Sequence, residues 1–428
     1  MGVEFPVMAS TTLEVAPHSM AEPAPDAAEV ACCIAGGGPA GAMFALLLAR
    51  RGVRVTLLEM HKDFDREFRG DTVHPSTLEI LDQLGLAERV HALRAGKVFA
   101  PIIVTANGAF APFDLHRLKS KYPYILMVHQ KLLLEILTEE AARYPNFQLR
   151  MGANVTELIT ESGAVHGVRY ASEDGTHEVR ALLTVGADGR FSRVRSLAGF
   201  EPIKTSPPMD VLWFRLPRLP SDPDAPGGAF GGIGKGHLVI GLDRGDYWQS
   251  GYVILKGSYQ EVRAEGLQAL RRHIVEIVPQ LEKHVQSLTD WHQIMLLSVE
   301  SSRCPVWYKP GLLVIGDAAH VMSPIGGVGI NYAIQDAVVA ANILTKPLLS
   351  GKVSVEQLKE VQHKREWPTR VIQFVQAQAQ KGIVANALRS QQMLRIPWYV
   401  RAFFRIPYLR DLPARLVAFG PVRVRVEN

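Results

Sequence analysis

Three glycines near the start of the chain have the spacing of a phosphate-binding turn. Gly36, Gly38 and Gly41 lie in the stretch IAGGGPAG. In such a turn the first glycine permits a tight bend, the second lets the backbone approach a pyrophosphate, and the third lets a helix pack closely on a strand. The phosphates then rest against the positive N-terminal end of that helix. The spacing therefore predicts a dinucleotide site.

The sequence on both sides of the turn supplies the elements that must position it. Residues 29–35 read as a short buried strand, and residues 39–51 read as a helix that ends at Gly52. A second strand follows and ends at Glu59, eighteen residues after the last glycine of the turn. A carboxylate at this position can accept hydrogen bonds from a ribose diol. Both NAD and FAD fit this pattern, so other segments must distinguish them.

A second strand, loop and helix are predicted at residues 311–336. Asp317 comes where the strand ends, so that its carboxylate can reach a hydroxyl of a sugar alcohol. Pro324 and the glycines after it let the backbone pack against a flat ring. The helix, which we expect to begin near Gly329, directs its free N–H groups and its positive end toward that ring. This arrangement suits a reduced flavin, which carries negative charge at N1 and C2=O.

A third segment has the pattern DGxxSxxR directly after a strand, with Asp188 and Arg195 at its ends. The order of the three motifs, which span residues 34–336, resembles that of the class A flavoprotein monooxygenases, the para-hydroxybenzoate hydroxylase superfamily. The resemblance implies an α/β fold. Its parts would be a Rossmann-like FAD-binding domain of the glutathione-reductase type, an interleaved antiparallel-sheet substrate domain and a helical C-terminus.

The resemblance also implies a set of residues that bind FAD. In chain order these are Gly36, Gly38, Gly41 and Glu59 at the ADP half, Arg69 at the phosphates, Gln130 at a helix start, Asp188 and Arg195 shared between FAD and NAD(P)H, Asp317 at the ribityl chain, and Pro324, Gly329, Ile330 and Asn331 at the isoalloxazine ring. NAD(P)H would be a transient co-substrate, because the chain has no second glycine turn of this kind. No CxxC or HExxH spacing occurs, so we expect no metal.

The chain divides into parts that differ in composition and pattern. The first segment is rich in alanine and proline and lacks the pattern of a signal peptide, so we expect it to be a disordered leader. The expected boundaries are 1–28 for the leader, 29–98, 125–200 and 303–350 for the FAD-binding domain, 99–124 and 201–302 for the substrate domain, and 351–428 for the C-terminal helical region.

The resemblance implies hydroxylation of an aromatic, polyketide or quinone-like small molecule with molecular oxygen. Reduced flavin would form a C4a-hydroperoxide that transfers one oxygen atom to an electron-rich ring. Water destroys this intermediate without product, so the reaction needs a dry pocket under the second domain. His237, Tyr247 and Trp248 lie among predicted strands of that domain and are candidates for the pocket. The motifs identify no general base, so the catalytic residue is unknown.

Two other flavin reactions fit the same motifs. A reductase or dehydrogenase of the geranylgeranyl-reductase type would saturate double bonds instead of using oxygen. A halogenase is less favoured, because no WxWxIP-like string follows the glycine turn. Turnover without oxygen would separate the reductase from the hydroxylase.

Charge and cysteine content limit the partners and the compartment. The net charge of +5 is concentrated in residues 389–428, which contain eight arginines. These arginines indicate either peripheral contact with a membrane surface or side chains whose stems cover the edge of the core. Three cysteines cannot form a disulfide framework, which fits a cytoplasmic location. We expect no nucleic-acid partner, and the sequence does not set the oligomeric state.

Overall fold

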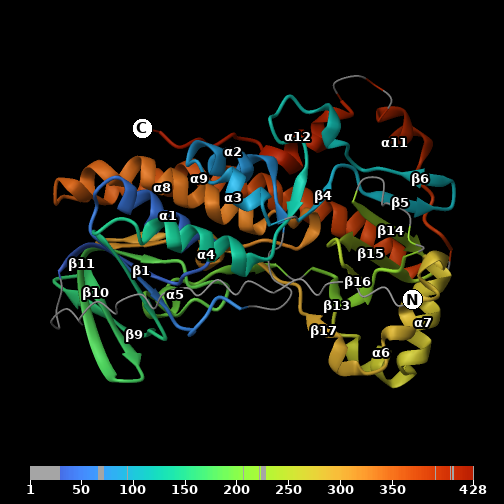
Figure 1. The fold of residues 1–428 in the computed structure, drawn as a ribbon, viewed down its shortest axis with the longest axis horizontal. Helices are drawn as coiled ribbons and strands as arrows, with labels where there is room; N and C mark the ends of the chain where they lie inside the picture. Colours follow the sequence, from blue (N-terminus) through green and yellow to red (C-terminus); the bar gives the residue numbers. More distant parts are fainter. Residues whose placement is uncertain are drawn as a thin grey trace, which may run out of the picture.

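Two large β-sheets organise the protein, one toward each end of its long axis (Figure 1). The computed structural model describes residues 29–65, 72–93, 95–205, 207–220, 222, 228–390, 392–404, 406 and 409–427. The first sheet has the strand order β19 (Tyr308–Lys309), β20 (Leu312–Val314), β11 (Gly175–Gly186), β1 (Val30–Ala35), β2 (Val55–Glu59) and β8 (Phe147–Met151), with β10 (Ala164–Ser172) and β9 (Asn154–Glu161) extending from β11. The second has the order β17 (Met295–Leu297), β13 (Met209–Pro217), β16 (Tyr247–Leu255), β15 (His237–Asp243), β14 (Ala229–Gly234), β5 (Ile102–Thr105) and β6 (Gly108–Phe110).

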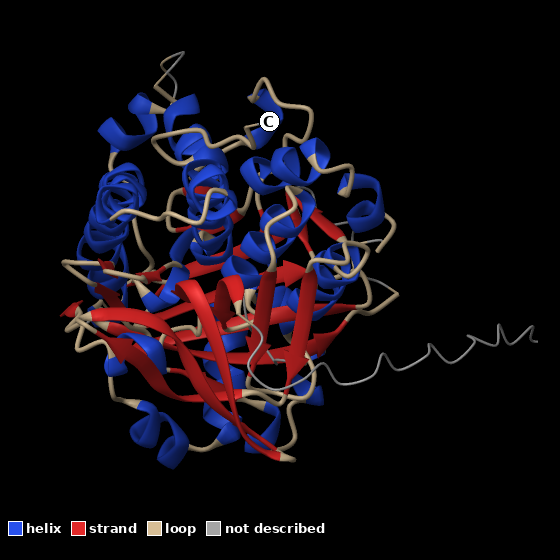
Figure 2. Ribbon diagram, turned by 90° about the vertical axis from the view of Figure 1, so that its left-hand side faces the viewer, coloured by secondary structure: helices blue, strands red, loops and turns tan. Residues whose placement is uncertain are grey.

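The structure confirms the expected unit of strand, turn, helix and strand. β1 runs parallel to both β2 and β11, and β2 ends at Glu59. α1 (Pro39–Arg50) begins with a proline, which suits the first helical position, and Gly52 follows it with a φ of +82°. α4 (Gln130–Ala141) and α8 (Gly329–Leu349) pack on α1, so its side chains are almost all buried. Figure 2 shows the strands as a central layer with helices on both sides.

The second sheet is mainly antiparallel, as expected, but β14 pairs with β5 in parallel. Alternate residues of a strand point to opposite faces of the sheet. One face, called here the outer face, carries Phe214 and Tyr252 and packs on α7 (Leu267–Ile277). The other, called the inner face, carries Trp213 and forms one apolar cluster with Ala387 and Leu388 of the C-terminal part, against which Ile325, just before α8, packs. The inner face is therefore the one directed toward the loop where we expect the flavin ring.

The remaining elements surround these two sheets. Two three-stranded sheets are formed by β3 (Thr72–Val73), β7 (Ile125–Met127) and β4 (Gly96–Val98), and by β12 (Ile203–Thr205), β18 (Ser301–Arg303) and β21 (His320–Val321). The other helices are α2 (Pro75–Gln83), α3 (Ala87–His91), α5 (Arg193–Leu197), α6 (Tyr259–Glu265), α9 (Val355–Ala379), α10 (Ala385–Arg389), α11 (Trp398–Phe403) and α12 (Asp411–Phe419). The last four of these confirm the helical C-terminus.

Arginines of the C-terminal part make contacts within the chain. Arg423 forms an ion pair with Glu79 of α2, and Arg401 donates a hydrogen bond to the carbonyl oxygen of Asn107 at 2.7 Å. These contacts engage the guanidinium groups within the chain, and both interpretations of the arginines stay predictions. None of the described helices has the length and apolar character needed to cross a membrane.

A buried group of charged side chains joins α8 to α9. Asp336 accepts a hydrogen bond from Nε of Arg365 at 2.7 Å, and its other oxygen lies 2.6 Å from Nε2 of His320. The N–H group of Gly316 donates to that same oxygen at 3.0 Å. Burial raises the pKa of Asp336, but the charges and hydrogen bonds of His320 and Arg365 outweigh it and hold the pKa below its usual value. Asp336 therefore stays ionised and anchors the loop after β20.

A second buried group, His74, precedes α2 and is neutral at physiological pH. Its Nδ1 donates to the carbonyl oxygen of Val417 in α12 at 2.7 Å. Burial lowers its pKa to about 4, against a smaller opposite effect of that hydrogen bond. In the unfolded chain the imidazole binds a proton near pH 6.5. Between these pH values the unfolded state binds more protons than the folded state, so stability is lost as the pH falls from 6.5 to 4.

We expect the His74→Gln variant to show a weaker loss of stability at acid pH than the parent. The difference between the pKa values of His74 in the unfolded and folded states corresponds to about 3 kcal/mol of unfolding free energy at pH 4. Urea unfolding at a series of pH values measures it. His292→Gln is the matched control, because the side chain of His292 is 99% exposed. Parallel pH profiles for the parent and the His74 variant would contradict the assignment.

Candidate active site

The glycine turn joins β1 to α1 and packs against the loop after β11. A Cβ on Gly36 would lie 2.5 Å from the carbonyl oxygen of Ala187, and one on Gly41 would overlap the carbonyl oxygen of Gly36. Gly36 also has a φ of +104°, which favours glycine. A Cβ on Gly38 would meet a single described atom within range, the Ala187 oxygen at 4.0 Å. The protein's own packing thus requires Gly36 and Gly41, whereas a Cβ on Gly38 has room among the described atoms.

Glu59 lies at the end of β2, directly beside this turn. Its Oε2 accepts a hydrogen bond from the N–H group of Gly37 at 2.8 Å. Its Oε1 accepts from the N–H group of His61 at 3.0 Å and lies 2.6 Å from Nδ1 of the same residue. These contacts fix the carboxylate at the carboxyl edge of the parallel strands, where a ribose is expected. Sequence reasoning missed His61, whose one signal is its position two residues after the acid.

The loop after β11 carries Asp188 and Arg195, and both are engaged within the chain. Asp188 accepts hydrogen bonds from the hydroxyl of Ser192 and, at 2.9 Å, from the N–H group of Val194, so that it caps α5. Burial raises the pKa of Asp188, and these hydrogen bonds lower it less. The guanidinium of Arg195 donates to the carbonyl oxygen of Ala318 at 3.1 Å. Arg195 therefore ties the loop after β11 to the loop after β20.

Asp317 lies in a short 3₁₀ turn directly after β20. The preceding residue, Gly316, has a φ of +60°, and a Cβ on it would lie 3.0 Å from the Cβ of Ala40 in the first turn of α1. Asp317 is therefore next to the helix that begins at the glycine turn. A single ligand that extends from Gly38 to Asp317 requires this placement.

The loop before α8 contains Pro324 and two glycines with a left-handed backbone. Gly326 has a φ of +79° and Gly327 a φ of +62°. The hydroxyl of Thr72 donates to the carbonyl oxygen of Gly327 at 2.7 Å. α8 begins at Gly329 without an acidic residue in its first turn. Its N–H groups and positive end are therefore directed toward this loop.

The side chain of Asn331 is fully used inside the protein. Its Oδ1 accepts from the N–H group of His74 and from the hydroxyl of Thr77, both at 2.8 Å. Its Nδ2 donates to the carbonyl oxygens of Thr72 at 3.0 Å and Gly327 at 3.2 Å. A primary amide has two donors and two acceptor sites, and all four are occupied here. The side chain thus fastens the start of α8 to α2 and β3, which leaves the backbone of Asn331 for a ligand.

Three further residues expected at the cofactor differ in their placement. Gln130 is the first residue of α4. The side chain of Ile330 is buried in the core of the first sheet, so its backbone is the part that can face a ligand. Arg69 lies outside the described residues. Among the described residues, the structure brings together the glycine turn, Glu59, the loops after β11 and β20, and the start of α8.

The three pocket candidates lie on opposite faces of the second sheet. Trp248 belongs to the outer-face core, so the preceding residue, Tyr247, is on the inner face. The ring centre of Tyr247 is 6.5 Å from that of His129, which precedes α4. Nδ1 of His237 lies 2.5 Å from the hydroxyl of the outer-face residue Tyr252. His237 and Trp248 therefore point away from the face where we expected a pocket. The sequence could not show this, because alternation along a strand reveals two faces without showing which one is covered.

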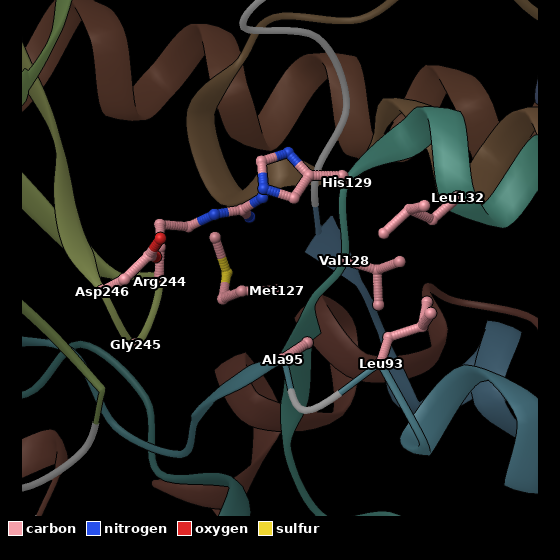
Figure 3. Close-up of a pocket in the computed structure, with 9 residues that line it drawn as sticks. All are labelled: Leu93, Ala95, Met127, Val128, His129, Leu132, Arg244, Gly245 and Asp246. Atoms are coloured by element: carbon pink, nitrogen blue, oxygen red, sulfur yellow. The ribbon is translucent and has the colours of Figure 1, made fainter. Parts of the chain in front are cut away.

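A cavity of about 300 Å³ lies where β7 and the start of α4 meet the turn between β15 and β16 (Figure 3). In Figure 3 the side chain of Arg244 extends from the turn toward His129, across Met127. Arg244 is buried, and sequence reasoning missed it because nothing near it in the chain marks it. The cavity is lined by Leu93, Ala95, Met127, Val128, His129, Leu132, Arg244, Gly245 and Asp246.

Comparison with known proteins identifies the family. Residues 29–375 match the family described as FAD binding domain. The chain belongs to the class A flavoprotein monooxygenases. It is thus an FAD-dependent oxidoreductase. The 6-methylpretetramide 4-monooxygenase of Streptomyces rimosus is 33% identical over 414 residues, which cover 95% of this flavoprotein and 96% of that relative.

Other relatives match less of their own length or share the fold alone. The 12-dehydrotetracycline 5-monooxygenase/anhydrotetracycline 6-monooxygenase of S. rimosus is 32% identical over 71% of this flavoprotein and 60% of the relative. The solved OxyS anhydrotetracycline hydroxylase of S. rimosus has a TM-score of 0.70 at 23% identity, over 91% of this chain and 76% of that one. The flavin-dependent brominase Bmp2 has a TM-score of 0.74 at 17% identity, over 91% and 94%.

The residues of this flavoprotein are compatible with FAD in an extended form. The open space at Gly38 admits a pyrophosphate, and the first turn of α1 contains no acidic residue that would repel it. The carboxylates of Glu59 and Asp317 are hydrogen-bond acceptors of the kind that sugar hydroxyls need. The positive start of α8 suits a ring that becomes anionic on reduction.

Replacing Gly38 by alanine should weaken FAD binding without unfolding the protein. The added Cβ has room among the described atoms, but it occupies the space where the backbone must approach the pyrophosphate. We expect the Tm of the apoprotein to change by less than about 2 °C. The Kd for FAD, measured by fluorescence titration, should rise by at least about tenfold.

The Gly41→Ala variant is the matched control for this prediction. Its Cβ overlaps the carbonyl oxygen of Gly36, so this variant should lose both apoprotein stability and FAD. If Gly38→Ala bound FAD as tightly as the parent, the pyrophosphate would not lie beside Gly38.

Proposed function

We propose that the protein hydroxylates a fused polycyclic aromatic polyketide at a phenolic ring, using FAD, NAD(P)H and molecular oxygen. The observation that carries the proposal is that three distant segments contact one another: the glycine turn, the loop after β11 and the loop after β20. Similarity over nearly the full length to a 6-methylpretetramide 4-monooxygenase supports the substrate class. Cytoplasmic location and membrane contact of the C-terminal part stay predictions.

In this proposal the chain binds FAD along the crevice and fixes its two ends. The ADP half lies at the glycine turn and Glu59, the ribityl chain at Asp317, and the ring between Pro324 and the start of α8. When bound, FAD supplies the transfer of electrons from NAD(P)H to oxygen and the delivery of one oxygen atom, by the C4a-hydroperoxide route expected for the family. Asp188 and Arg195 act indirectly, because they hold the two loops together.

We place the substrate beside the contact between the loop before α8 and the inner face of the second sheet. Ile325 of that loop packs against an apolar cluster of the inner face that includes Trp213, Ile240 and Leu242. A molecule bound beside this contact meets apolar side chains, which exclude water. Exclusion of water favours oxygen transfer over the release of peroxide.

The cavity in Figure 3 serves as the entrance to this site. Its wall includes the guanidinium of Arg244 and the carboxylate of Asp246, and Leu132 and Val128 make part of it apolar. This combination suits a phenolic molecule, whose anionic form also reacts faster with an electrophilic oxygen. Tyr247 lies close to His129 of the cavity and on the inner face of the sheet. In this proposal it lies on the path from the cavity to the substrate site.

A substrate screen tests the proposed function. The FAD-loaded protein is mixed with NADH or NADPH and a panel of fused-ring phenols, and oxidation of the cofactor, product and hydrogen peroxide are measured together. We expect a fused-ring phenol to accelerate oxidation and to gain one oxygen atom. Reduction of a substrate double bond without oxygen would instead establish the reductase alternative.

We expect the Tyr247→Leu variant to raise the KM for the substrate by about tenfold. The reason is that loss of one aromatic contact on the path costs about 1.4 kcal/mol of binding. The Kd for FAD should stay the same, because the crevice that we assign to FAD is formed by other segments. Steady-state kinetics and FAD titration measure the two effects.

His237→Gln is the control for the face of the sheet. His237 belongs to the same sheet but pairs with Tyr252 on the outer face. We expect its KM to match that of the parent. A larger effect at His237 than at Tyr247 would place the substrate on the outer face.

A further inference from the structure

α9 carries a polar stripe beside the apolar residues that it buries, which include Leu358, Val361 and Ile372. The interior face of a helix is normally apolar, because an amide buried without a hydrogen-bond partner is unfavourable. The stripe recurs every three or four residues along α9 and into the π-helical turn that follows it. Its members are Gln362, Arg365, Thr369, Gln373, Gln376 and Gln380.

Two glutamines of the stripe hold the loop that contains Pro324. Nε2 of Gln376 donates to the carbonyl oxygen of Ser323 at 2.9 Å and to that of Ile325 at 2.7 Å. Nε2 of Gln380 donates to the hydroxyl of Ser323 at 2.5 Å. Both glutamines and Ser323 are buried. The residues on each side of Pro324 are therefore fastened to one helix.

The rest of the stripe fastens the chain that leads to this loop. Nε2 of Gln373 donates to the carbonyl oxygens of Ser302 at 2.9 Å and Val321 at 3.1 Å. Nε2 of Gln362 donates to the carbonyl oxygen of Pro305 at 2.7 Å. Backbone carbonyl groups that regular structure leaves unpaired must find such partners elsewhere. α9 thus provides partners for the path from β18 to the loop before α8.

We propose that Gln376 and Gln380 are positioning residues for oxygen transfer, acting through the backbone around Pro324. This inference rests on the proposed function, in which that loop faces the flavin ring. Ile325 in the same loop contacts the inner face of the second sheet, so the loop sets the spacing between the ring and the substrate. Loss of the glutamine donors frees the loop and admits water between them, which diverts oxygen to peroxide.

The Gln376→Met variant tests the inference, since methionine has a similar length and no donor. In the apoprotein we expect hydrogen exchange of the segment 321–328 to rise by about tenfold or more. In the FAD-loaded protein we expect the share of NAD(P)H oxidation that ends as peroxide to rise at least about threefold. The Kd for FAD should change by less than about threefold, because the ADP half binds elsewhere.

Gln378→Met is the matched control, because Gln378 is exposed on the same helix two residues away. Gln380→Met is the second test variant, and it allows the inference to be tested even if Gln376→Met does not fold. The inference is wrong if both test variants show parent-like exchange in the segment, or if they keep parent-like coupling. It is also wrong if Gln378→Met produces the same changes. Hydrogen exchange is measured without the cofactor. If the parent protein oxidises no NAD(P)H, the proposed function is wrong, while the exchange result still tests whether the two glutamines hold the loop.

Discussion

Buried backbone without a regular hydrogen-bond pattern must take its partners from side chains, and this requirement shapes the whole crevice. Glu59 accepts from the glycine turn, Asp336 accepts from the loop after β20, and Asn331 donates to the loop before α8. Glu59 and Asp336 lie at least twenty residues from the loops that they hold, whereas Asn331 holds the loop just before it. An extended ligand can then bind without first ordering these loops, which lowers the entropy cost of binding.

The same contacts decide where charge is available for a ligand. The carboxylates of Asp188 and Asp336 are engaged by protein donors, Val194 in one case and Arg365 in the other. The beginnings of α1 and α8 carry no acidic residue in their first turns. Backbone N–H groups at these two helix ends are thus suited to anionic groups, the pyrophosphate at one end and the reduced ring at the other. Charge stabilisation by helix ends needs no side chain to move.

Local patterns predicted the parts of the site that adjacent residues determine. The spacing of Gly36, Gly38 and Gly41, the strands beside them and the helical C-terminus all follow from neighbours in sequence. Long-range pairing was not predictable in this way. The placement of Trp248 depends on which face α7 covers, and the role of Gln376 depends on carbonyl groups more than fifty residues away. A repeat of glutamines every three or four residues was the available signal, and it reads equally as a solvated helix face.

The fold determines the cofactor more strongly than the fate of the oxygen atom, since a brominase with a TM-score of 0.74 and a hydroxylase with 0.70 share it. The difference between bromination and hydroxylation must come from the space over the flavin ring. Here Ile325 packs against the apolar cluster that the inner face forms with α10, so a substrate must bind beside this contact. A flat fused ring needs a gap of only about 3.5 to 4 Å on each side. That spacing is set by the loop before α8, so the proposed hydroxylation depends on how firmly Gln376 and Gln380 hold this loop.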